Sequence, residues 1–218
     1  MMQSDLSRAS GREALLDAAA ALMDERGVDQ VSLNEITAAS GNHNRSAVRY
    51  HFGSREELVR ALVARTMAAI DAERTALLDH LEATRQELDP RQAIEVVVGP
   101  LARQLRTLEG RRYLRLCGQL LNHPRYNTEA REALQMNTSL ARAARHVAPL
   151  LMQLPPAIAI ERASQIIGFV VRALADQARL VDSDPPPREP LPEDVFAKNL
   201  VDVTLGIVTA TTTTPATA

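Results

Sequence analysis

Apolar residues recur at intervals of three and four positions over most of the chain, which is the spacing of one face of an α-helix. Alanine is frequent and runs of β-branched residues are few, which favours closely packed helices. From this pattern we expect helices at residues 11–26, 33–39, 45–52, 55–81, 90–105, 111–121, 128–154, 157–180 and 193–209. The pattern therefore predicts an all-α fold of about nine helices.

Three Ser-x-x-Glu sequences indicate where the first helices begin. They lie at Ser10–Glu13, Ser32–Glu35 and Ser54–Glu57. In each, the serine can accept a bond from a backbone amide while the glutamate reaches back to the serine's own N–H. Gly27 and Gly53 are expected to end the first and third helices. Two short helices joined by a glycine turn and packed on a longer first helix form a helix-turn-helix.

The segment 42–55 is basic and holds no acid, and the third helix lies within it. On a helical wheel Val48 and Phe52 share one side and are expected in the core. The expected outward side combines small residues, which permit close approach, with long hydrogen-bond donors: Asn44, Arg45, Ser46, Ala47, Arg49, Tyr50 and His51. A helix that enters the major groove of DNA needs this combination, and a carboxylate there would repel phosphate.

These features occur in the stretches GREALLDAAAALMDERG, VSLNEITAASG and SAVRYHFGSREELVRAL. Over about residues 9–65 they resemble the N-terminal domain of TetR-type transcriptional regulators. The run from Gly41 to Phe52 is one residue longer than the family's commonest spacing, with Asn42 the expected extra residue, and we assign it to a subgroup with a longer turn. The resemblance implies a DNA-binding domain at 9–53 and an effector-binding and dimerisation domain at 54–209. We expect 210–218 to be a disordered tail.

The resemblance also implies which side chains meet DNA. Base edges are expected to meet Arg45, Ser46, Ala47 and Arg49, and phosphates are expected to meet Tyr50, Arg55 and the helix start at Ser32. The free amides of a helix N-terminus favour an anion, which agrees with the assignment of Ser32. His51 is expected to have a structural or marginal role. The turn residue that faces DNA is left open among Asn42, His43 and Asn44.

A single module of this kind offers few base contacts, so adequate specificity implies two copies that read a near-palindrome. The predicted helix at 157–180 is apolar on more than one face, which is more than one protomer core can use. We therefore expect a homodimer whose interface comes from the last two helices, at Ile166, Val170, Leu174, Phe196, Leu200, Val203 and Ile207. The alternative is that these residues only complete the core of a monomer.

The remaining helices correspond to the family's ligand-binding domain by position alone. Polar candidates for an effector pocket are Tyr113, Cys117, Gln119, His146 and Gln177, each of which could instead be a satisfied core or surface residue. A pocket of aliphatic side chains without tryptophan suits a small, largely apolar effector. The effector would shift an equilibrium between DNA-competent and incompetent spacings of the recognition helices. The fourth helix is the expected connection.

Charge and composition narrow the classes of function. The net charge is −2 and residues 1–60 hold seven arginines against nine acids, so any contact with nucleic acid must be local. The chain has one cysteine, no signal-peptide pattern at its start and no apolar run long enough to span a bilayer. These features favour a cytoplasmic protein.

No nucleophile elbow, phosphate-binding loop or zinc-ligand spacing is present, so we predict neither enzyme activity nor a cofactor or metal. The sequence predicts a sequence-specific DNA-binding transcriptional regulator. Repression of a palindromic operator, relieved by a small molecule, is the family's usual mode. The alternative is a helical protein-interaction bundle that does not bind DNA.

Overall fold

The computed structural model describes residues 2–42, 44, 46–84, 88–121, 123–127 and 138–213. Within these ranges every regular element is helical, which confirms the predicted all-α fold. The elements are α1 (Met2–Arg26), η1 (Val28–Gln30), α2 (Leu33–Ala39), α3 (Ala47–Phe52), α4 (Arg55–Ala83), α5 (Pro90–Ala102), η2 (Arg103–Arg106), α6 (Leu108–Leu120), α8 (Thr138–Leu151), α9 (Pro156–Asp182) and α10 (Glu193–Thr209).

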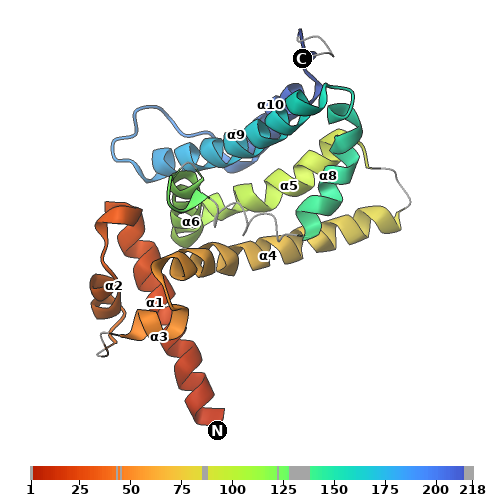
Figure 1. Ribbon diagram of the computed structural model, residues 1–218. Helices are drawn as coiled ribbons and strands as arrows, with labels where there is room; N and C mark the ends of the chain where they lie inside the picture. Colours follow the sequence, from red (N-terminus) through yellow and green to blue (C-terminus); the bar gives the residue numbers. More distant parts are fainter. Residues whose placement is uncertain are drawn as a thin grey trace.

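The N-terminal helices α1, α2 and α3 gather at one end of the molecule, where the first turns of α4 pack against α3 (Figure 1). α1 begins at Met2, so the start predicted at Ser10 is wrong. Residues 2–9 contain neither glycine nor proline, and the helix therefore continues through the Ser10–Glu13 sequence. As a result the N-terminal end of α1 projects beyond α3 (Figure 1).

The other two predicted helix starts are confirmed. Ser32 Oγ accepts the Glu35 N–H at 3.2 Å, and the Glu35 carboxylate accepts the Ser32 N–H at 2.7 Å. Ser54 Oγ accepts the Glu57 N–H at 3.1 Å at the start of α4. α1 ends as predicted at Gly27, whose φ of 89° places it in the left-handed region that favours glycine.

The larger part of the molecule has helices stacked between α4 and a layer formed by α9 and α10. α4 runs from α3 along one side, and α9 and α10 lie on the side away from α3 (Figure 1). α5, α6 and α8 pack between them. α9 and α10 closely match the predicted ranges, whereas the first part of the helix predicted at 128–154 lies outside the described residues.

α6 is fixed by two close approaches. A Cβ on Gly118 would lie 2.6 Å from the Ala175 Cβ of α9, and a Cβ on Gly110 would lie 2.1 Å from the Gln104 carbonyl oxygen. Neither distance leaves room for a side chain, so glycine lets α6 approach its neighbours closely at both positions. This close packing gives α6 a fixed position between the N-terminal helices and α9.

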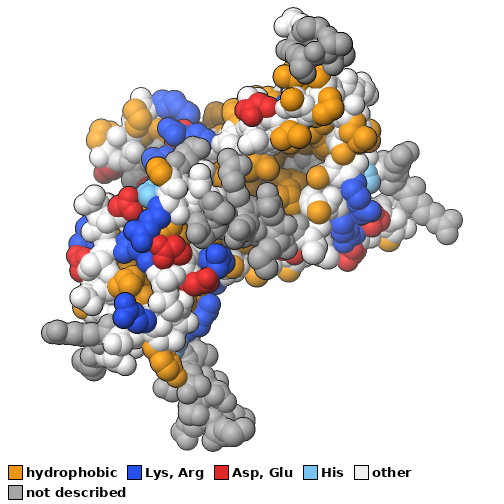
Figure 2. Space-filling model, viewed as in Figure 1, with side chains coloured by type: hydrophobic (Ala, Val, Ile, Leu, Met, Phe, Trp, Pro, Cys, Tyr) orange, Lys and Arg blue, Asp and Glu red, His pale blue; other side chains and the backbone are white. Residues whose placement is uncertain are grey.

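The surface of the larger part is partly apolar. Figure 2 shows hydrophobic side chains gathered where α8, α9 and α10 meet. Met152 and Ile160, at the corner between α8 and α9, are 80% and 73% exposed. No described helix is long and apolar enough to cross a membrane.

Candidate nucleic-acid interface

α3 is a six-residue helix that is anchored by its apolar side. Val48 and Phe52 are buried, as predicted. Ala47 is also buried, with 2% of its surface exposed, so the prediction that it faces outward is wrong. The regular helix begins at Ala47 rather than Arg45, and a tight turn in which the Ala47 N–H donates to the Asn44 carbonyl at 2.9 Å carries Ala47 inward beside Val48.

The outward side of α3 is formed by Ser46, Arg49 and Tyr50. All three side chains are exposed, and Tyr50 has 63% of its surface accessible. His51 is half-buried, and its ring meets the Tyr50 ring edge to face at 5.1 Å between centroids. Arg45 lies outside the described residues. The described outward face thus combines a small residue with an arginine and a tyrosine, which are donors suited to bases and phosphates.

The turn between α2 and α3 is built by asparagine side chains. Asn42 Oδ1 accepts the Asn44 N–H at 3.0 Å, and Asn44 Oδ1 accepts the Ser46 N–H at 3.0 Å. Asparagine side chains that bond to the backbone two residues later form such turns without help from the rest of the protein. His43 lies outside the described residues, so the choice among the three turn residues stays open.

Arg55 has a structural role that sequence analysis missed. Its Nη2 donates to the carbonyl oxygens of Val28 and Val31, the latter at 2.5 Å. These bonds tie the start of α4 to the segment between η1 and α2. These bonds engage one nitrogen of the guanidinium, so the phosphate contact expected of Arg55 stays a prediction.

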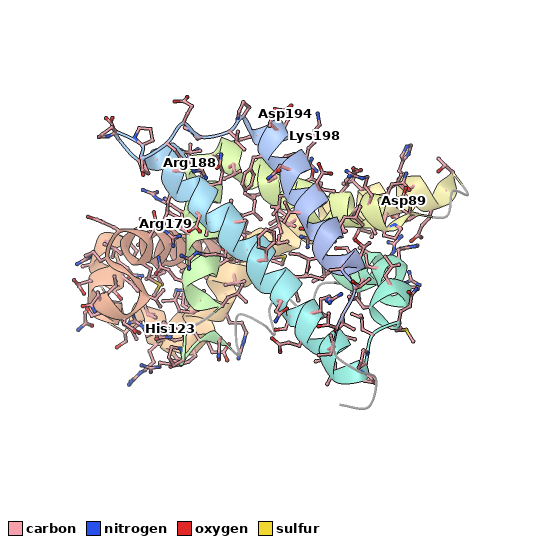
Figure 3. The ribbon with its side chains drawn as sticks, turned by 90° about the horizontal axis from the view of Figure 1, so that it is seen from above. Asp89, His123, Arg179, Arg188, Asp194 and Lys198 are labelled. Carbon is pink, nitrogen blue, oxygen red and sulfur yellow. The ribbon has the colours of Figure 1, made fainter. Side chains whose placement is uncertain are left out.

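Most acids of the N-terminal region are held by basic partners, many of them on later helices. The pairs are Glu13 and Asp17 with Arg65, Asp24 with Arg115, Asp29 with His123, Glu35 with Arg26, Glu56 with Arg125, and Glu57 with Arg60. His123 lies beside the N-terminal helices when the molecule is seen from above (Figure 3). This pairing explains how an N-terminal region with more acids than arginines can still present arginine and tyrosine on α3. Asp24 has no basic residue three or four positions away that could pair with it on the same helix. That absence is the one sign in the sequence that its partner lies on another helix.

Glu35 accepts hydrogen bonds both from the start of its own helix and from Arg26 on α1. Hydrogen bonds from the Ser32 backbone and hydroxyl, and then from Arg26 at 2.8 Å, lower the pKa of Glu35 to about 2. A negative charge therefore lies at the start of α2, where a phosphate was predicted at Ser32. The Ser32 N–H is already bonded to Glu35, so a phosphate there would depend on the other amides of the first turn.

Comparison with known proteins identifies the N-terminal domain. Residues 15–62 match the family described as "Bacterial regulatory proteins, tetR family". The N-terminal domain of the chain is therefore of the TetR type. This match covers the C-terminal part of α1, all of α2 and α3 and the start of α4, and it confirms the family resemblance of the sequence. No curated protein matches the chain.

Solved structures share the fold over most of the chain. The fatty acid degradation regulator FadR from Bacillus halodurans has a TM-score of 0.60 at 14% identity, with 89% of this chain and 97% of that chain covered. PfmR from Thermus thermophilus, a TetR family transcriptional regulator, gives 0.54 at 18% identity, with 88% and 96% covered. NalD from Pseudomonas aeruginosa, the secondary repressor of the MexAB-OprM multidrug efflux pump, gives 0.54 at 23% identity, with 89% and 95% covered.

The candidate effector residues of this chain do not converge on one cavity. Tyr113 and Cys117 are buried one turn apart on α6, and burial raises the pKa of the Cys117 thiol to about 12. Gln177 is buried and donates to the Leu191 carbonyl at 2.9 Å, which is a structural contact. His146 is half-buried on α8.

A cavity of about 400 Å³ lies elsewhere, between α1, α4 and α6. Its lining is largely polar and includes Arg65, Gln104, Arg112 and Tyr113, so Tyr113 is the single predicted effector residue in it. Gln119 is half-buried on α6 and is not among the lining residues. Sequence periodicity shows that a residue faces inward, but not which inward-facing residues surround a common space.

The predicted dimer residues divide between core and surface. Leu174 and Leu200 are buried in the protomer, as are Val170 and Phe196, so the expectation that they face a partner is wrong. Ile166 and Ile207 are half-buried, and Val203 is 41% exposed. The exposed apolar residues of α9 and α10 are Ile160, Ile167, Phe169, Val181, Val195 and Val203. Spacing identified the apolar helices correctly but selected the face that packs on α5 and α6.

Proposed function

We propose that this protein is a DNA-binding transcriptional regulator that acts as a homodimer on a near-palindromic operator, with small-molecule control of repression. The observation that carries the proposal is the construction of α3. Val48 and Phe52 anchor the helix, while Ser46, Arg49 and Tyr50 stand at the surface. Such a helix can enter a major groove without unfolding any part of its own domain.

Two copies are needed because one short helix makes few contacts. A good bidentate contact to a base discriminates by only about 1–3 kcal/mol. The exposed apolar residues of α9 and α10 support a partner on that face, and α9 and α10 lie side by side in the view from above (Figure 3). Asp194 and Lys198 lie at the start of α10, and Arg179 lies in the last turn of α9 (Figure 3).

The effector is proposed to bind among α1, α4 and α6, where the cavity of about 400 Å³ has a volume suited to a small molecule. Arg65 and Arg112 in its lining argue for a more polar effector than the aliphatic composition suggested. A molecule there would contact both α4 and α6. It could therefore favour one arrangement of the N-terminal helices over another, provided that it binds the two arrangements with different affinity.

Selection of bound fragments from random DNA by the purified protein tests this function. The wild type is expected to select a two-fold symmetric consensus, and its affinity is expected to fall steeply with salt. Arg49→Ala is expected to weaken binding by about tenfold or more and to relax the consensus at one position per half-site. Arg60→Ala, which removes a partly exposed arginine paired with Glu57 on α4, is the matched control and should bind like the wild type.

A protein-interaction bundle without DNA binding makes the opposite prediction. It would select no consensus, and Arg49→Ala would change nothing. The family match at residues 15–62 and the exposed donors of α3 do not favour that alternative.

A further inference from the structure

The junction between the N-terminal helices and the larger part is held by a cluster of charged side chains on α1, α6 and α9. Arg115 on α6 donates from Nε and Nη2 to the two carboxylate oxygens of Asp24 on α1, at 2.7 and 2.6 Å. Its Nη1 bonds to Asp182, the last residue of α9, and to the Ala178 carbonyl at 3.3 Å. Arg111 adds a bond of 2.7 Å to Asp182. We call Asp24, Arg111, Arg115 and Asp182 the α6 clamp.

Both aspartates of the α6 clamp occupy positions that are unfavourable for a carboxylate by themselves. Asp24 lies in the last turn of α1, and Asp182 ends α9. The C-terminal end of a helix carries partial negative charge, so an aspartate there is repelled unless a cation compensates. Arg111 and Arg115 supply that compensation, and hydrogen bonding to Asp24 raises the pKa of the Arg115 guanidinium.

The α6 clamp is more sheltered than the other contacts across the junction. The side chains of Arg115 and Asp24 are 11% and 12% exposed. Arg125, which pairs with Glu56, is 60% exposed, and Asp29, which pairs with His123, is 55% exposed. Exposed pairs contribute little, whereas breaking a sheltered pair leaves a charge without its partner in a poorly solvated place. The clamp is therefore the most sheltered of the ion pairs that hold the N-terminal helices on the larger part.

The clamp also joins two helices with different proposed tasks. α1 packs against α2, which in turn packs against α3 of the proposed DNA-binding surface. α9 belongs to the apolar layer proposed as the dimer interface. A single guanidinium on α6 contacts both, and glycines pack α6 closely against its neighbours. Displacement of the end of α9 would therefore be transmitted to α1 through Arg115 without passing along α4.

We propose that Asp24, Arg115 and Asp182 are positioning residues that set the spacing of the two α3 helices in the dimer by fixing α1 to the end of α9. This inference rests on the proposed function and adds a second connection to the one through α4. Loss of either aspartate weakens the bridge at one end, with only the Ala178 carbonyl bond of Arg115 left on α9 when Asp182 is lost, and gives the two N-terminal domains a wider range of separations.

The test measures that separation directly, in full-length protein without DNA. A spin label is attached at Gln30→Cys, an exposed position of η1, in a background that carries Cys117→Ala because Cys117 is the only native cysteine. Pulsed electron spin resonance then gives the distance distribution between the two labels of the dimer. Asp24→Asn and Asp182→Asn are each expected to make this distribution about twice as broad as that of the unsubstituted clamp.

Asp176→Asn is the matched control. Asp176 is also on α9, six positions before Asp182, and it pairs with Arg172 and Arg179 of its own helix at 2.9 and 2.8 Å. This variant should keep the narrow distribution. If Asp24→Asn does not fold, Arg115→Lys replaces it, because lysine keeps the charge but cannot form the fork that binds Asp24 and Asp182 together.

The outcomes separate this inference from the proposed function. A distribution that stays narrow in Asp182→Asn overturns the bridge, even if Asp24→Asn broadens it, because Asp24 would then act only locally. A monomeric protein would also overturn it. In DNA selection, both clamp variants should accept a wider range of half-site spacings than the wild type. Failure of the wild type to select any DNA would contradict the proposed function and leave the distance measurement to decide the bridge.

Discussion

The outward side of α3 and the exposed side of the α9–α10 layer are two surfaces of opposite character on one protomer. On α3 the exposed groups are a hydroxyl, a guanidinium and a phenol, from Ser46, Arg49 and Tyr50. On α9 and α10 they include Phe169 and Val203, with 36% and 41% of their surfaces exposed. Each surface is presented on a helix whose other side is buried.

The difference teaches what each surface can bind. Exposed donors on a packed helix suit a polyanion. On binding, their hydrogen bonds to water are replaced by hydrogen bonds to phosphates and bases, and the counter-ions of the polyanion are released. Apolar side chains on neighbouring helices gain instead from removal of their surface from water, at roughly 25 cal/mol per Å². A second copy of the chain offers the same surface and so satisfies both protomers at once.

The largest expected effect tests the apolar surface. Val203→Asp should give a folded monomer, because Val203 is exposed in the protomer but would be buried in the dimer, where an unpaired carboxylate is costly. Affinity for a full operator should then fall by about a hundredfold or more, since the two half-sites are no longer bound together. Light scattering coupled to size-exclusion chromatography gives the mass, and a fluorescence titration gives the affinity.

Leu77→Asp is the matched control for that change. Leu77 lies on α4, is 37% exposed, and is far along the chain from the α9–α10 layer. The same loss of an exposed apolar side chain there should leave both the dimer and the DNA affinity intact. A dimer that survives Val203→Asp, or one that Leu77→Asp also dissociates, would contradict the assignment of the interface to α9 and α10.

The next prediction tests whether Ala47 belongs to the exposed side of α3 or to the core. Ala47 is buried beneath α3, so Ala47→Leu should overpack the core and lower the free energy of unfolding by about 1–3 kcal/mol. Ala39→Leu on α2, where the side chain is exposed, should change it by no more than about 0.5 kcal/mol. Urea unfolding followed by circular dichroism measures both. Equal free energies of unfolding for the two variants would contradict the burial of Ala47 beneath α3.

Ala47 also shows why the sequence predicted the positions of the helices better than it predicted which side of each helix faces the core. The periodicity and the serine caps at Ser32 and Ser54 identified helices α2 and α4 because these signals are local. The orientation of α3 depends on the turn before it, where Asn42 and Asn44 bond to the backbone and shift the first regular residue of the helix. A wheel drawn from Arg45 therefore placed Ala47 on the wrong side.

The larger part of the chain shows the same limit more strongly. Spacing placed Leu174 and Leu200 on apolar faces, but an apolar face can pack on its own protomer or on another, and only the tertiary arrangement decides. The contacts of Arg115 with Asp24 and Asp182 join residues 91 and 67 positions apart. No local pattern connects such residues, so the junction that fixes the N-terminal domain could not be predicted from the sequence.

The smallest effect concerns acid and the α3 side of the comparison. The pKa of Glu35 is lowered from 4.5 to about 2 in the fold, so the deprotonated carboxylate stabilises the capped start of α2. This contribution is fully present above pH 4.5 and is lost as the pH falls from there towards 2, because the unfolded chain then takes up a proton first. The α9–α10 layer has no part in this contact, so the loss is expected at the start of α2.

Glu35→Gln isolates that contribution. The amide oxygen can still accept the Ser32 N–H but carries no charge, so the variant should be slightly less stable than the wild type at about pH 6 and should lose less of its stability between about pH 5 and pH 3. Melting temperatures measured at several pH values give the two curves, and hydrogen exchange at α2 locates the change. Parallel curves would show that the carboxylate contributes nothing beyond its hydrogen bond, and the charge at the start of α2 would then have no part in holding the polar surface in place.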